Sequence, residues 1–172
     1  MTQLVLTAVG DDREGLVSAL STAVESHAGN WLDSQFARLA GKFAGVVLVE
    51  LPAEEVSAFT AAAAALRDEI GWKVDVTPAA AGGAVGREVQ VHLLGLDRPG
   101  MVRQISTALA EQHVSITGFQ SLTRDAPESG GVLFEATAVV TLPDGLEVEA
   151  VRAALEPIAD ELMVDLELVE PS

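Results

Sequence analysis

Apolar residues near the N-terminus follow first the pattern of a strand and then that of a helix. Residues 4–9 are a short, mostly apolar run whose length fits a buried strand. After a polar turn at residues 11–15, apolar side chains return at helical spacing, as Leu16, Val17, Leu20 and Val24. The first 25 residues therefore predict a strand, a turn and a helix.

The next 50 residues predict two strands, a second helix and a last strand. Residues 30–39 and 42–51 fit strands joined by a tight turn at Ala40-Gly41. A second helix, broken by Gly71, follows from a stripe at helical spacing: Val56, Phe59, Ala63, Leu66 and Ile70. Residues 73–76 alternate as a closing strand. The predicted order is β-α-β-β-α-β.

The second half of the chain repeats the first. Asp-Arg-Glu-Gly-Leu-Val at 12–17 matches Asp-Arg-Pro-Gly-Met-Val at 97–102, at an offset of 85 residues. The offset grows to 91 where Phe43 meets Phe134, and the six extra residues fall within 125–131. Pro, Ser and Gly in that segment predict a longer loop. Near the end of each copy, Val74-Asp75-Val76 matches Val164-Asp165-Leu166. The chain thus contains two diverged copies of one unit.

The repeat predicts two domains, at 1–78 and 87–172, joined by a linker of small residues at 79–86. The last helix of the second copy follows from Val148, Val151, Leu155, Ile158 and Leu162. Pro157 within it is expected to kink or shorten that helix.

Two β-α-β-β-α-β units in tandem predict an α+β protein made of ferredoxin-like units. Each is a four-stranded antiparallel sheet with both helices on one face. A unit of about 80 residues buries only roughly 60–65% of its unfolded-state surface, so it is marginally stable alone. Because the strands carry apolar residues on both faces, we expect the sheets to pair, within one chain or between two.

The acidic charge of the chain argues against nucleic acid as a direct partner. The 172 residues hold 10 Lys+Arg and 26 Asp+Glu, for a net charge of −16. Split at Gly86, the first half has 5 basic and 11 acidic residues and the second has 5 and 15. Since binding to nucleic acid needs clustered cations, direct binding is excluded. A role in gene control would pass through a partner protein.

Composition limits the other classes. The absence of cysteine excludes disulfides, thiol catalysis and thiolate metal sites. No apolar run approaches the ~20 residues that span a bilayer, and the N-terminus lacks the basic segment of a signal peptide. We therefore expect a cytoplasmic protein that does not bind membranes.

The turn before the first helix of each copy carries the candidate chemistry. It reads Asp12-Arg13-Glu14-Gly15 in one copy and Asp97-Arg98-Pro99-Gly100 in the other. Helix N-terminal amides converge beside the end of a strand there, which suits an anionic ligand group. The glycine is expected to permit close backbone approach, and the aspartate to cap the helix. The same aspartate can bind an ammonium while the arginine and amides bind a carboxylate.

These turns carry a family resemblance. A strand ending in Asp-Arg-x-Gly, then a helix with Ser-Thr-Ala, then a turn into Asn30-Trp31 or Ser115-Ile116, resembles an ACT domain in both copies. Tandem ACT proteins without another domain resemble the glycine cleavage system transcriptional repressor group. The resemblance implies amino-acid ligands at interfaces between paired units, a protein partner such as a transcription factor, and a homodimer. It implies contacts at Asp11, Asp12, Arg13, Gly15, Leu16, Asn30, Asp97, Arg98, Gly100, Met101 and Ser115.

Alternatives remain at this point. Glu14 stands where the second copy has Pro99, and Asn30 where it has Ser115, so either copy can be the one that binds. The turns can also be purely structural in a module that only oligomerises. An enzyme is not expected, because no nucleophile–base pair or phosphate loop is found. Asp11-Asp12 lacks the further ligands of a metal site, and His27, His92 and His113 are interpreted as structural, so neither metal nor cofactor is expected.

Overall fold

The computed structural model describes residues 1–80, 82–83, 85–128 and 130–171, which form two compact units, Met1–Ala81 and Gly82–Ser172. In unit 1 the elements are β1 (Thr2–Asp11), α1 (Leu16–Ser26), β2 (Asn30–Leu39), β3 (Lys42–Leu51), the 3₁₀ turn η1 (Ala53–Glu55), α2 (Val56–Ile70) and β4 (Lys73–Pro78). In unit 2 they are β5 (Arg87–Leu96), α3 (Met101–Glu111), β6 (Ser115–Ala126), β7 (Gly131–Leu142), α4 (Val148–Leu162) and β8 (Val164–Val169).

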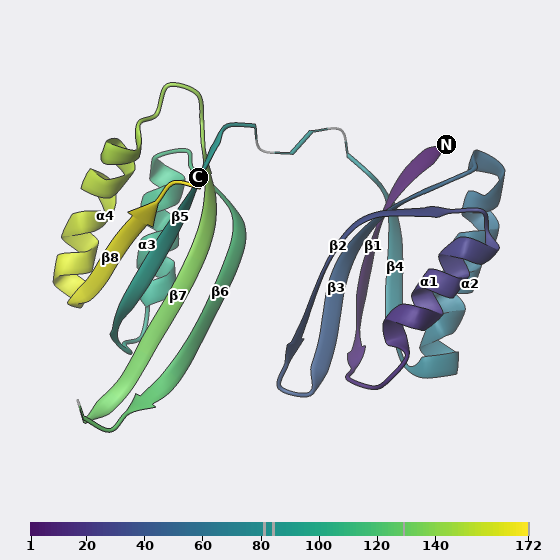
Figure 1. Cartoon of the computed structure of the whole chain (residues 1–172), viewed down its shortest axis with the longest axis horizontal. Helices are drawn as coiled ribbons and strands as arrows, with labels where there is room; N and C mark the ends of the chain where they lie inside the picture. Colours follow the sequence, from purple (N-terminus) through teal and green to yellow (C-terminus); the bar gives the residue numbers. More distant parts are fainter. Residues whose placement is uncertain (81, 84, 129, 172) are drawn as a thin grey trace. The chain divides into compact units, whose positions relative to one another are not determined.

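Each unit is a four-stranded sheet with two helices on one face (Figure 1). The strand orders are β2-β3-β1-β4 and β6-β7-β5-β8, and every pair of neighbours is antiparallel. The predicted α+β fold, with the β-α-β-β-α-β pattern twice, is confirmed.

The alternation of apolar residues decides which sheet face the helices cover. In unit 1, Leu6 of β1 lies opposite Val47 of β3, and both side chains are fully buried. The apolar stripes of α1 and α2 pack on this face, and Phe59 of α2 is completely buried there. Val5, Thr7 and the residues in step with them point to the other face, which the unit's own helices leave open.

Strand register corrects the predicted match near the end of each copy. Val76 lies opposite Leu6 on β1, and Leu168 lies opposite Val91 on β5. Because Leu6 and Val91 are equivalent, Val76 corresponds to Leu168 and not to Leu166 as predicted. The similarity of the two segments suggested an alignment that is two residues out of register. Because side chains alternate between the two sheet faces, a shift of two residues leaves the same side chains facing the core.

The six extra residues of the second copy do not all lie in a loop, contrary to the prediction. β6 and β7 have 12 residues each, against 10 in β2 and β3. The strands are joined by residues 127–130 where unit 1 has Ala40-Gly41. Four of the extra residues therefore lengthen the hairpin strands; Ser129 lies outside the described residues.

Pro157 does not shorten its helix. Both α4 and α2 have 15 residues, and Pro157 stands on the exposed side of α4. The ring costs one backbone hydrogen bond. Burial of the apolar stripe formed by Val151, Leu155 and Leu162 keeps the helix intact on both sides of the proline.

Candidate functional site

Both turns hold their glycine in the left-handed backbone region. Gly15 has φ 83° and ψ 2°, and Gly100 has φ 90° and ψ 0°. These angles are those of the third residue of a type II turn, where glycine is strongly favoured and proline commonly precedes it, as Pro99 does. A Cβ built on Gly15 would meet no atom within 4 Å. The backbone conformation therefore favours glycine at both positions, and the close backbone approach of a ligand stays a prediction.

The aspartates do not cap the helices, which corrects a second expectation. Gly15 and Gly100 occupy the N-cap positions of α1 and α3, and in the described part of the chain neither helix has a side-chain capping hydrogen bond. The carbonyl oxygens of the two glycines accept hydrogen bonds from the amides of Ala19 and Gln104, at 2.9 and 3.0 Å. The amides of each first turn are thus left without a side-chain acceptor from the described residues, and such amides favour an anion.

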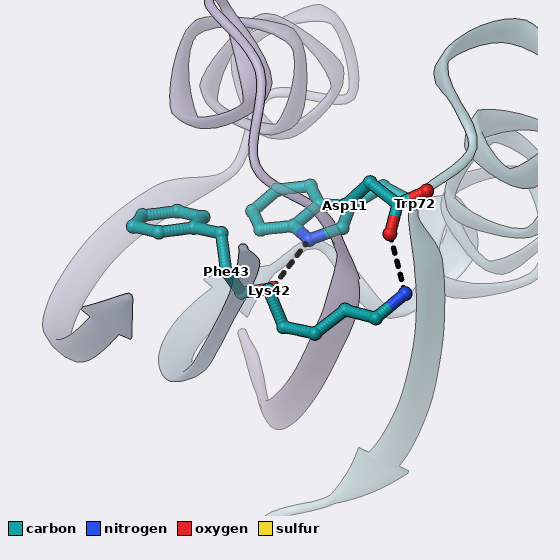
Figure 2. Close-up of polar contacts among 4 residues, drawn as sticks. All are labelled: Asp11, Lys42, Phe43 and Trp72. Carbon is teal, nitrogen blue, oxygen red and sulfur yellow. Dashed lines mark hydrogen bonds and ion pairs between the residues drawn. The ribbon is translucent and has the colours of Figure 1, made fainter. Parts of the chain in front are cut away.

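In unit 1 the aspartates instead tie the turn to the β2–β3 hairpin. Asp11 forms an ion pair with Lys42 (Figure 2), and the carboxylate of Asp12 accepts a hydrogen bond from Arg38 at 3.3 Å. The backbone amide of Asp12 donates to the carbonyl oxygen of Gly41 at 2.9 Å. The hydrogen bond from Lys42, together with its positive charge, holds the pKa of Asp11 below its ordinary value.

Trp72 lies beside this turn and packs against β3, the strand that pairs with the end of β1. Its side chain is fully buried, and its ring nitrogen donates a hydrogen bond to the carbonyl oxygen of Phe43 at 3.4 Å, as Figure 2 shows. The two rings stack with centroids 5.9 Å apart. A Cβ on Gly10 would lie 2.7 Å from the carbonyl oxygen of Gly71, so β1 and the α2–β4 junction are in close contact here.

All five Lys and Arg side chains of unit 1 lie at this same end of the sheet. Lys42 pairs with the end of β1, Lys73 lies opposite Val9, and Arg67 is in the last turn of α2. Arg13 is in the turn itself and Arg38 is near the end of β2. In the described part of unit 1, the opposite end has no Lys or Arg and carries Glu25, Glu50, Glu54 and Glu55. Counting charges along the sequence could not reveal this separation, because the cations come from five different elements.

The turn of unit 2 has fewer connections. The amide of Asp97 donates to Val132 at 2.8 Å, as in unit 1. However, the cross-strand position of the Asp11–Lys42 ion pair is taken in unit 2 by Leu96 opposite Leu133, which cannot form one. Thr123 stands where unit 1 has Arg38. Asp97 makes no ion pair with the residues that the structure describes. Its carboxylate can therefore pair with an ammonium group without first breaking an ion pair with another residue.

Asn30 and Ser115 lie far from the turns of their own units. Asn30 is opposite Glu50 on β3, whereas Asp11 is opposite Lys42, eight residues away along that strand. At ~3.4 Å per residue the separation is about 27 Å. Ser115 is likewise opposite Thr141, at the far end of sheet 2 from the turn. A site that combines Asn30 or Ser115 with a turn requires two units, as the family resemblance implies, and their role stays a prediction.

Two of the predicted contacts belong to the core. Leu16 and Met101 are 3% and 2% exposed, so they can offer a ligand only their backbone. The side chains of Asp11, Asp12, Arg13 and Asp97 are accessible, and Arg98 is half-buried with its amide donating to the sulfur of Met101 at 3.3 Å.

The edge strands β2 and β6 each contain a β-bulge that the sequence did not reveal. The register shifts between Trp31 and Asp33 in β2 and between Ile116 and Gly118 in β6. The bulged residues Leu32 and Thr117 are equivalent at the offset of 85. Because each bulge comes two residues after Asn30 or Ser115, it changes which face the following side chains take.

Two of the histidines have polar partners, and no group of three potential metal ligands is found within the described residues. The Nδ1 atom of His27 lies 2.8 Å from the carbonyl oxygen of Ala23, and that of His92 lies 3.0 Å from the hydroxyl of Thr137. His92 is on an inner strand and partly buried. No helix in the described residues is long and apolar enough to cross a membrane.

We predict a small, pH-dependent contribution of Asp11 to stability. Its pKa is lowered in the folded state from an unfolded value of about 3.9, so the stabilisation is present above pH ~4 and lost as the pH falls through the folded pKa. Asp11→Asn should lower the free energy of unfolding slightly at pH 7, and the difference from the wild type should shrink as the pH falls below ~4, as measured by urea titration. The effect is small because both partners are more than half exposed. A difference that stayed constant as the pH fell below ~4 would contradict this assignment.

Comparison with known proteins gives a family match and structural matches that include the two full-length ones below. Residues 2–77 match the ACT domain family model. A crystal structure of an unknown protein from Galdieria sulphuraria has 28% identity and a TM-score of 0.88, with 99% of each chain covered. A "putative glycine cleavage system transcriptional repressor" has 16% identity and a TM-score of 0.73, with 99% of this chain and 98% of that one covered. No curated protein sequence matches significantly.

Proposed function

We propose that this tandem ACT-domain protein regulates a partner protein by binding a small ligand. Its first unit belongs to the ACT domain family, and its second unit has the same fold. The ligand is an amino acid, and the protein is non-catalytic. The domains are 1–78 and 87–172 with a linker at 79–86, and we expect a cytoplasmic homodimer.

The duplicated turn carries this proposal. In both units a left-handed glycine opens a helix whose first-turn amides have no side-chain cap, next to an aspartate and an arginine. Amides and guanidinium suit a carboxylate, and the aspartate suits an ammonium. Those two groups stand on the same carbon in an α-amino acid. Two diverged copies that keep both charges and the same backbone conformation support a shared ligand chemistry.

The partner is proposed to be a protein, such as a transcription factor of the glycine cleavage system. The acidic charge of the chain supports an indirect action on genes, because it opposes direct contact with nucleic acid. The full-length structural match agrees in fold with this assignment.

A second candidate is an oligomerisation module without a ligand. The ion pairs that anchor the turn of unit 1 favour it, because they show that the Asp-Arg-x-Gly turn also has a structural role.

Thermal unfolding against a panel of the common amino acids at millimolar concentration distinguishes the two. A ligand at a hundred times its Kd stabilises by about 2.7 kcal/mol. Each kcal/mol raises Tm by roughly 4–8 °C for a unit of this size. We expect a shift of several degrees for one or two amino acids. A flat panel would favour the oligomerisation module.

A further inference from the structure

The open face of sheet 2 combines apolar and acidic side chains. On β5, Val89, Val91 and Leu93 are buried beneath the helices, so the residues between them point to the open face. Large apolar side chains remain accessible on this face: Leu96 is 41% exposed and Leu122 is 53% exposed. We call this surface of β5, β6, β7 and β8 the acidic sheet face; its strands are labelled in Figure 1.

A hollow of about 330 Å³ lies on this face, across β7, β5 and β8. His92 lies between Thr137 on β7 and Glu167 on β8. Two residues along β5, Leu94 lies between Glu135 and Asp165. The hollow therefore has an apolar and aromatic centre with carboxylates at its sides. A long side chain with an apolar stem and a cationic end, as in lysine and arginine, matches that arrangement.

Most carboxylates on the acidic sheet face have no ion-pair partner among the described residues. The face has four, on Glu88, Glu135, Asp165 and Glu167, against one guanidinium, on Arg124, for a net charge of −3 with neutral histidine. Arg124 contacts Glu135 at 3.5 Å. Asp165 and Glu167 form no ion pair with the residues that the structure describes. Covering these carboxylates without a cation would cost free energy, because a buried charge must be paired.

The net charge of −3 decides which kinds of molecule can bind to the acidic sheet face. The same face of a second copy would bring another −3 and be repelled, as would an anionic membrane surface or a nucleic acid. A cationic protein segment would be attracted over a distance and paired on contact.

We propose that the acidic sheet face docks a cationic amphipathic segment of the partner protein, in which Lys or Arg alternates with apolar residues. The proposal rests on the proposed function only in that a regulator needs a partner. The apolar side chains of the segment cover Leu96 and Leu122, and one of its cations enters the hollow between Asp165 and Glu167.

Peptide binding to the full-length protein tests this. The probe is a fluorescent 12-residue peptide of alternating lysine and leucine, followed by anisotropy at low salt. The test variant carries Asp165→Asn with Glu167→Gln. The matched control carries Asp160→Asn with Glu161→Gln, which removes the same charge from exposed positions on α4, in the helix layer of the same unit. We expect Kd to rise at least about tenfold for the test variant and at most about threefold for the control.

Leu122→Ser measures the apolar part of the contact, and is expected to weaken the lysine–leucine peptide without affecting a lysine–serine peptide. Equal loss of affinity in the test and control variants would overturn the proposal, because the peptide would then respond only to net charge. Absence of binding, or a change of oligomeric state in the test variant by sedimentation, would overturn it as well. The amino-acid thermal shift is measured on the same proteins. A flat amino-acid panel leaves peptide binding intact, so the two failures are distinguishable.

Discussion

Trp72→Ala is expected to unfold unit 1 selectively. The side chain is fully buried, stacks on Phe43 and donates a hydrogen bond to its backbone. Truncating a buried tryptophan costs about 3–5 kcal/mol, because contacts are lost and a cavity remains. A unit of about 80 residues has a total stability near the lower end of roughly 5–15 kcal/mol. The variant unit should therefore be largely unfolded at temperatures where unit 2 is intact.

Calorimetry and hydrogen exchange check this expectation. The compact units have separate hydrophobic cores, so the variant should show two transitions, with exchange protection lost in residues 2–78 and retained in 87–169. Trp31→Ala is the control, because Trp31 is only partly buried and its removal should shift Tm much less. A single cooperative transition that moved as a whole would show that the two units unfold together.

Gly100→Val is expected to abolish most of the proposed response to an amino acid. A β-branched residue with positive φ is strained, which would displace the first-turn amides of α3 from the ligand. The turn of unit 2 should contribute more than that of unit 1, since Asp97 is not held by a cation among the described residues whereas Asp12 is held by Arg38. We expect the ligand-induced rise in Tm to fall to less than half.

The chain offers a matched control for that variant. Gly145 has φ 85° and, as at Gly15, a Cβ added there would meet no atom within 4 Å, but it lies in the β7–α4 connection at the other end of unit 2. Gly145→Val should cost a similar amount of backbone strain, about 1–2 kcal/mol, and keep the ligand response. Gly15→Val measures how much of the ligand-induced rise in Tm depends on the turn of unit 1. An unchanged response in both the Gly15 and Gly100 variants would refute the site.

Local patterns predicted the elements well because each pattern has a local physical cause. The period of the apolar residues specified β2, β3 and α2, and Gly71 and Ala40-Gly41 marked where the chain turns. The same reasoning was wrong about the capping of α1 by Asp12. Helix capping depends on where a side chain points after the turn has formed, and here Arg38, 26 residues away, provides the partner.

By itself, the sequence determined the repeated β-α-β-β-α-β order, the core faces and the acidic charge. The element order and the core faces follow from hydrophobic periodicity and the charge follows from composition, and none of these depends on distant contacts. The tertiary structure alone decided three things: that Asn30 lies about 27 Å from its own turn, that five Lys and Arg side chains gather at one end of unit 1, and that a hollow on sheet 2 is lined by three carboxylates, of which only Glu135 forms an ion pair among the described residues. Each depends on strand register and antiparallel pairing, which bring together residues that are far apart along the chain.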